Sequence, residues 1–133
     1  MIQVADVAMT HVSPNCSNTR GSVIRKATSN DLSSMLLIMD RALGEPTLPE
    51  EMEERLTRWQ LKLQNESDLI FLVVEAKDGQ LIGWCRGGRT IELHRFANGE
   101  PYDCEIHNIF ILPEYQRRGF GRKLWQRMFD EIR

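Results

Sequence analysis

The distribution of hydrophobic and polar positions along the chain predicts a mixture of strands and helices. Apolar runs at 69–74 and 106–112 show little alternation, which is typical of strands buried on both faces. Three other segments repeat their apolar residues every three or four positions, as amphipathic helices do. These helical positions are Leu32, Met35, Leu36, Met39 and Leu43, then Met52, Leu56, Trp59 and Leu63, then Phe120, Leu124, Trp125, Met128, Phe129 and Ile132.

Capping signals support these helices. Thr28 can cap the first helix, because Asp31 follows three residues later as in a short capping box, and Gly44 is a natural stop. Pro49 is expected in the first turn of the second helix, where its missing N–H costs little. In the third helix, Trp125 is expected to lie in the hydrophobic core.

Turn residues divide the strands. Asp78-Gly79 predicts a hairpin, and Gly87-Gly88 are expected to break the chain after its second strand. Strands are therefore predicted at 23–27, 69–74, 81–85 and 102–112. The order β-α-α-β-β-β-α predicts an α/β (α+β) domain over residues 23–133, with helices packed on a sheet. Residues 1–22 show no clear periodicity and are predicted to be a disordered N-terminal extension.

Composition and charge narrow the function classes. The 133 residues suit one domain, and the net charge of −2 argues against a general nucleic-acid binder. No apolar run approaches the roughly 20 residues of a membrane span, and the first residues do not resemble a secretory signal. Cys16, Cys85 and Cys104 are an odd set without metal-ligand spacing. We therefore expect free thiols, a cytoplasmic protein, no membrane partner and no metal.

Residues 116–121, with the sequence QRRGFG, join a predicted buried strand to the last helix. The first N–H groups of a helix lack partners within it, and the helix dipole adds about half a positive charge there. Glycine at positions 119 and 121 lets the backbone approach a ligand closely, while Arg117 and Arg118 add attraction for anions. The turn is therefore a predicted anion site, best suited to phosphate.

Three better-known motifs do not fit this turn. A P-loop needs four residues between its glycines, and here only one separates Gly119 from Gly121. The dinucleotide pattern GxGxxG fails at Leu124. An RNA-binding strand motif begins at Arg118 but fails after Gly121, where the residues take helical periodicity. RNA binding through the basic run at 117–123 stays as a remote alternative.

The stretch EIHNIFILPEYQRRGFGRKLWQRM resembles the acetyl-CoA motif of the GNAT superfamily of N-acetyltransferases. VIRKATSNDL is similar to the usual opening of that family, and LVVEAKDGQLIGWC to its central hairpin. The resemblance covers about residues 23–133 and is most specific in the last thirty. It implies a mixed central sheet flanked by helices and an acetyl transfer from acetyl-CoA, as co-substrate, to a primary amine of a small molecule or peptide.

The resemblance also implies roles for individual residues. The pantetheine arm of acetyl-CoA would lie along the strand at Ile109, Phe110 and Ile111, where a backbone amide would stabilise the oxyanion. Glu105, fourteen residues before Gly119, matches the general base of the histone-type members, with His107 as the alternative base. The pyrophosphate would lie on Gln116, Arg117, Arg118, Gly119, Phe120 and Gly121.

A buried strand followed by an amphipathic helix normally crosses over to a parallel strand, and no residue follows Arg133. We therefore expect a domain that is incomplete at its C-terminus and lacks the family's usual last strands and last helix. The strand at 106–112 would have a bare apolar edge, which favours homodimer formation. A non-catalytic CoA-binding or partner-binding domain is the main alternative function.

Overall fold

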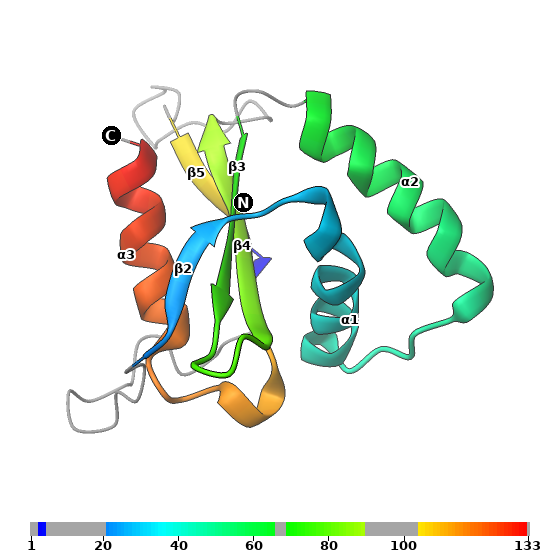
Figure 1. The fold of residues 1–133 in the computed structure, drawn as a ribbon. Helices are drawn as coiled ribbons and strands as arrows, with labels where there is room; N and C mark the ends of the chain where they lie inside the picture. Colours follow the sequence, from blue (N-terminus) through cyan, green and yellow to red (C-terminus); the bar gives the residue numbers. More distant parts are fainter. Residues whose placement is uncertain (1–2, 5–20, 66–68, 90–103, 133) are drawn as a thin grey trace, which may run out of the picture.

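A computed structural model describes residues 3–4, 21–65, 69–89 and 104–132, and Figure 1 shows their arrangement. The strands are β1 (Gln3–Val4), β2 (Val23–Lys26), β3 (Leu69–Glu75), β4 (Leu81–Arg89) and β5 (Cys104–Ile111). The α-helices are α1 (Leu32–Leu43), α2 (Pro49–Asn65) and α3 (Phe120–Ile132). Two short 3-10 helices, η2 (Ser29–Asp31) and η3 (Pro113–Tyr115), precede α1 and follow β5.

The strands form one sheet in the order β1-β5-β4-β3-β2. Strands β2 to β5 are antiparallel to their neighbours, while β1 runs parallel to β5, so the sheet is mixed as expected. In Figure 1, α3 covers one face of the sheet and α1 and α2 lie on the other. The predicted α/β architecture, with the order β-α-α-β-β-β-α from β2 onward, is therefore confirmed.

Local signals fixed the helix ends as expected. The amide of Thr28 donates a hydrogen bond to the Asp31 carboxylate at 2.7 Å, and this closes the turn before α1. Gly44 ends α1 in the left-handed region at φ 70°, where a residue with a Cβ would be strained. Pro49 is the first residue of α2.

The core lies on both faces of the central strands. On the α1 side, the buried Trp84 indole donates a hydrogen bond from Nε1 to the carbonyl of Met35 at 2.8 Å, which ties α1 to the sheet. Trp59 of α2 packs edge-on against Trp84 with ring centroids 5.6 Å apart. On the α3 side, Leu124 and Met128 are fully buried. The central strands β4 and β5 thus lie between two packed layers.

The structure corrects two predictions about single positions. Gly87-Gly88 do not break the chain, because β4 continues to Arg89 and both glycines keep partners in β3 and β5. Trp125 is not in the core, since 38% of it is exposed. It lies about 100° around α3 from Leu124, away from the line that faces the sheet, and packs edge-on against Phe129 at 4.6 Å.

The N-terminal extension also differs from expectation where it is described. Gln3 and Val4, expected to be disordered, form β1 and pair with Asn108 and Ile109 of β5. The edge of β5 is therefore covered at these two positions rather than bare. Two residues are too few to show a strand period, and so the sequence carried no signal for β1. The other residues at 1–20 lie outside the described part of the chain.

Candidate functional site

The site begins with the outer edge of β5. The amide of Leu112 donates to the carbonyl of Ile82 at 2.9 Å, just after β5. In an antiparallel pair, residues that bond to the partner alternate with residues whose backbone groups point away from it. Phe110, two residues before Leu112, therefore bonds toward β4. By the same alternation, the backbone groups of Ile109 and Ile111 point to the opposite edge.

A bulge interrupts the ladder just before this edge. Arg86 pairs with Asn108, but the next residue, Gly87, pairs with Ile106, so the strand register skips one position at His107. Bulges bend a strand and are common beside active sites. His107 is only 7% exposed, and its burial favours a structural role over the alternative role as general base.

Hydrogen bonds from Gln116 hold the turn after β5 in place. The side chain of Gln116 donates from Nε2 to the carbonyl of Ile111 at 3.0 Å, and its amide donates to the carbonyl of Pro113 at 3.3 Å. Tyr115 packs edge-on against Phe120 at 5.9 Å, as expected for a turn residue that contacts the last helix. Gln116 was predicted as an amide donor to the ligand, and here it holds the turn on the strand.

The backbone then curls into the start of α3. Arg117 has φ 66° and Gly119 has φ 96°, so two residues of the turn lie in the left-handed region. The amide of Lys123 donates to the carbonyl of Gly119 at 3.0 Å, so the amides of Phe120 and Gly121 precede the first bond of the helix. These two amides have no acceptor within α3, and they lie where the sequence predicts an anion site.

The basic side chains around the turn lie partly in solvent and partly against neighbouring residues. Arg117 and Arg118 are exposed, and the Arg118 guanidinium lies over the Tyr115 ring at 5.3 Å. The ammonium of Lys123 donates to the Ser22 hydroxyl at 2.8 Å. The arginines can therefore attract an anion from solvent, while the backbone supplies the fixed donors. Because residues after 119 are helical, the strand motif of RNA-binding proteins is not formed here.

Glu105, the predicted general base, lies in β5 opposite Gly88. Its side chain lies outside the described part of the structure, as does that of Cys104. The structure therefore places Glu105 on the same strand as Ile109 and Ile111, on the far side of the bulge from them. Its role stays a prediction.

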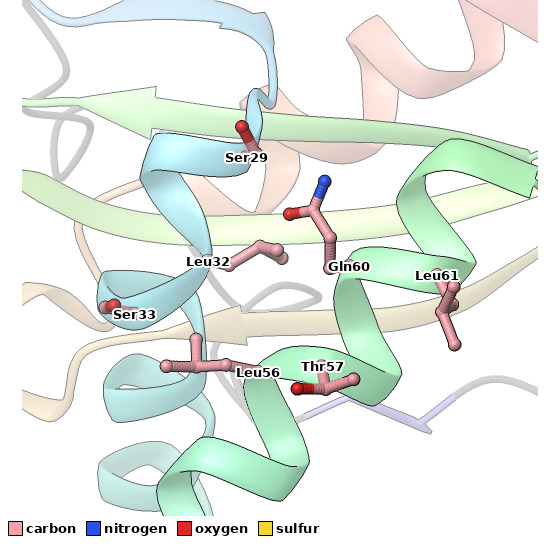
Figure 2. A pocket seen from close by; sticks show the side chains of 7 residues that line it. All are labelled: Ser29, Leu32, Ser33, Leu56, Thr57, Gln60 and Leu61. Carbon is pink, nitrogen blue, oxygen red and sulfur yellow. The ribbon is translucent and has the colours of Figure 1, made fainter.

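The sequence did not predict a groove between α1 and α2 (Figure 2). It has a volume of about 410 Å³, and in Figure 2 the Gln60 amide extends toward Ser29. Its lining residues are Ser29, Leu32, Ser33, Leu56, Thr57, Gln60 and Leu61. None of these is a predicted site residue. Helical periodicity places Leu32 and Leu56 on inward faces, but it carries no information on the gap between two helices.

Cys85 takes no part in the site. It is fully buried, and burial raises the pKa of its thiol, so it stays protonated and packs in the core as expected. Among the residues that the structure describes, no group of histidine, cysteine, aspartate and glutamate could hold a metal ion. None of the described helices is long and apolar enough to cross a membrane.

Comparisons with known proteins agree with this geometry. The profile of the Acetyltransferase (GNAT) family matches residues 32–133. Similar solved structures include the aminoglycoside antibiotic 6'-N-acetyltransferase AAC(6')-Ih from Acinetobacter baumannii, with a TM-score of 0.63, 19% identity, and coverage of 84% of this chain and 71% of that chain. A search of curated protein sequences finds no significant match.

Two further structures are similar to this chain. A predicted acetyltransferase with acetyl-CoA from Clostridium acetobutylicum has a TM-score of 0.62 at 21% identity, covering 83% of this chain and 72% of that chain. A spermidine N-acetyltransferase SpeG chimera from Vibrio cholerae and hSSAT has a TM-score of 0.60 at 23% identity, covering 84% of this chain and 63% of that chain. At these identities the structures support the fold.

Proposed function

This chain belongs to the GNAT acetyltransferase family, and we propose that it moves an acetyl group from acetyl-CoA to a primary amine. The observation that carries the proposal is the continuous backbone surface from the outer edge of β5 to the N-terminus of α3. An extended ligand with amide groups suits a strand edge, and a pyrophosphate suits the helix start that follows it. Acetyl-CoA has these two parts in this order.

In the proposed complex, the pyrophosphate lies on the amides of Phe120 and Gly121, with Arg117 and Arg118 at its side. The pantetheine arm runs along the outward groups of Ile109 and Ile111. The Ile111 carbonyl already accepts a hydrogen bond from Gln116, so its amide is the group left for the ligand. A neighbouring structure that contains acetyl-CoA, the protein from Clostridium acetobutylicum, supports this co-substrate.

The proposed reaction is direct attack of the amine nitrogen on the thioester carbonyl. The C–N bond forms, the oxyanion accepts a hydrogen bond from an outward amide near Ile109, and the C–S bond then breaks to release the thiolate of CoA. An alkyl amine has a pKa of about 10.4, so only about one in two thousand molecules is neutral at pH 7. Glu105, directly or through water, accepts the proton that the amine must lose.

The acceptor is proposed to be a primary amine of a small molecule or peptide. Two of the similar structures are named as acetyltransferases of an aminoglycoside and of spermidine, both of which are amines. Their identities with this chain are too low to indicate which amine it uses. A panel of polyamines, aminoglycosides and peptides with free amines would identify the acceptor.

Calorimetry with CoA tests the proposed pyrophosphate site at the amides of Phe120 and Gly121, which we call the cradle. Gly119→Glu places a carboxylate and a strained backbone (φ 96°) where the pyrophosphate would lie, so we expect CoA binding to fall by more than about a hundredfold. Gly79→Glu is the matched control, because Gly79 has a similar φ of 88° and open space around it in the β3–β4 hairpin. Equal binding of CoA by all three proteins would refute the proposed cradle.

A turnover assay tests the chemistry. With an accepted amine, Glu105→Gln is expected to lower kcat by about 10²- to 10⁴-fold near pH 7, with unchanged binding of CoA. Activity that is equal in the variant would remove Glu105 from the mechanism. CoA binding without product from any amine would favour the non-catalytic, CoA-binding alternative.

A further inference from the structure

The N-terminal strand β1 lies on the part of the sheet where the cofactor is proposed to bind. Gln3 pairs with Asn108 and Val4 with Ile109, in parallel orientation, and Figure 1 draws β1 as a short dark-blue strand. Ile109 has its backbone groups on this outer edge, because Phe110 bonds toward β4. Thus β1 meets the same groups of Ile109 that the pantetheine arm would use.

Strand spacing decides whether both can be present. Paired strands lie about 4.7–4.9 Å apart, which leaves no room for a second chain between β1 and β5. A backbone amide also donates to one strong acceptor at a time. We propose that β1 is an autoinhibitory strand, which competes with the pantetheine arm of acetyl-CoA for the outer edge of β5 at Ile109. This inference rests on the proposed function.

The short length of β1 suits a reversible contact. Its pairing covers two residues, whereas β4 pairs with β5 at seven positions from Gly83 to Arg89. Such a short strand is held weakly, so a cofactor with its own anchor at the α3 N-terminus can displace it. The apparent affinity for CoA is then the intrinsic affinity multiplied by the fraction of molecules in which β1 is released.

The test removes the pairing without touching β5. The double variant Gln3→Pro/Val4→Pro deletes both backbone donors of β1 and fixes φ at about −65°, away from the strand geometry in which a β1 carbonyl accepts from Ile109. The control Gln3→Thr/Val4→Ile keeps the donors with residues that favour strands. If β1 is paired in about nine of ten molecules, CoA binds the proline variant about tenfold more tightly than the wild type or the control. Deletion of residues 2–4 should have the same effect on CoA affinity, and both changes should lower the free energy of unfolding by the same tenfold factor, about 1.4 kcal/mol.

Two outcomes would overturn the inference. Equal CoA affinity in the wild type and the proline variant would show that β1 does not compete. Weaker binding by the proline variant would show instead that β1 completes the cofactor site. Gly119→Glu in both backgrounds separates this result from failure of the proposed function. If it abolishes binding in both, the cradle stands whatever β1 does, and if neither background binds CoA at all, the proposed function and the competition both fail.

Discussion

The turn after β5 and the connection between α1 and α2 fix the chain in opposite ways. The first is made by its backbone, with φ 66° at Arg117 and φ 96° at Gly119, and its arginines are exposed. The second is made by side chains. Asp40, 3% exposed, accepts two hydrogen bonds from Arg55, both at 2.8 Å, and one from Thr47 at 3.0 Å.

This difference distinguishes the proposed binding surface from a structural joint. The polar groups of the α1–α2 connection are used inward, so they hold the two helices together and leave little to offer a ligand. In the turn after β5, the first amides of α3 have no acceptor within the helix. Changes in the α1–α2 connection should therefore alter stability, and changes in the turn should alter CoA binding.

The largest expected effect on stability is at Asp40. Asp40→Asn removes a buried negative charge and leaves the Arg55 guanidinium, with a side chain only 14% exposed, without an opposite charge to pair with. Breaking a buried pair in this way costs about 3–5 kcal/mol. Denaturant unfolding measures the loss, and CoA affinity in the folded variant should equal that of the wild type.

A double variant provides the control for Asp40. In Asp40→Leu/Arg55→Met both charges are replaced by apolar side chains, which is expected to recover most of the lost stability. A single variant as stable as the wild type would show that the pair does not hold the two helices together.

A smaller and pH-dependent effect is expected at Asp31. Arg25 donates two hydrogen bonds to this carboxylate at 2.8 and 2.9 Å and lowers its pKa below the ordinary value. The carboxyl thus binds protons more readily in the unfolded chain, so its stabilisation is complete above pH of about 5 and is lost as the pH falls through the lowered pKa. Asp31→Asn should cost about 1–2 kcal/mol at pH 7.

The measurement for Asp31 is urea unfolding from pH 7 down to pH 2, where the wild type and the variant should converge at the acid end. Glu114→Gln is the matched control. Glu114 accepts a similar pair of hydrogen bonds from Arg41, at 2.7 and 2.9 Å, but its side chain is 45% exposed. Exposure limits this pair to less than about 1 kcal/mol. A gap between Asp31→Asn and the wild type that persists at pH 2 would contradict the assignment.

Asp31 and Asp40 also show which contacts cannot be predicted from the sequence. Asp31 was identified as the capping-box partner of Thr28, because a capping box depends on residues three positions apart. Arg25, which binds Asp31, also donates a hydrogen bond from Nε to the carboxylate of Glu75 at 2.6 Å, and Glu75 lies fifty residues further along the chain. Asp40 lies within a helix and gave no signal, since its pair with Arg55 depends on how α1 and α2 meet in space.

The candidate site was more readable because it is local. The strand, the turn and the helix start follow one another along the chain, and glycine at 119 marks a backbone conformation directly. The positive φ of Arg117 could not be predicted, since arginine favours no such conformation. The pairing of β1 with Ile109 was missed for another reason. It is short and joins residues more than a hundred positions apart.

A matched pair of glycines sharpens the comparison between the two regions. Gly119 (φ 96°) lies in the turn and Gly44 (φ 70°) in the α1–α2 connection. Alanine at either position is strained and should cost about 1 kcal/mol of stability. Only Gly119→Ala should also weaken CoA binding, because it adds a methyl group at the cradle. Calorimetry and unfolding on both variants measure the two effects, and weakened CoA binding by Gly44→Ala as well would contradict the separation of roles.

The smallest effects on stability and on CoA binding are expected at Arg117, although its charge makes it a prominent residue in the turn. Arg117→Gly removes an exposed charge from the turn but relieves its left-handed backbone, so the free energy of unfolding should change by less than about 0.5 kcal/mol. If the amides of α3 do most of the anion binding, the CoA affinity falls by no more than about fivefold, which is the contribution of one exposed ion pair. Titration with CoA at two salt concentrations measures this contribution. A loss as large as that of Gly119→Glu would show that the arginine, and not the backbone, makes the site, because in Arg117→Gly the backbone donors are all retained.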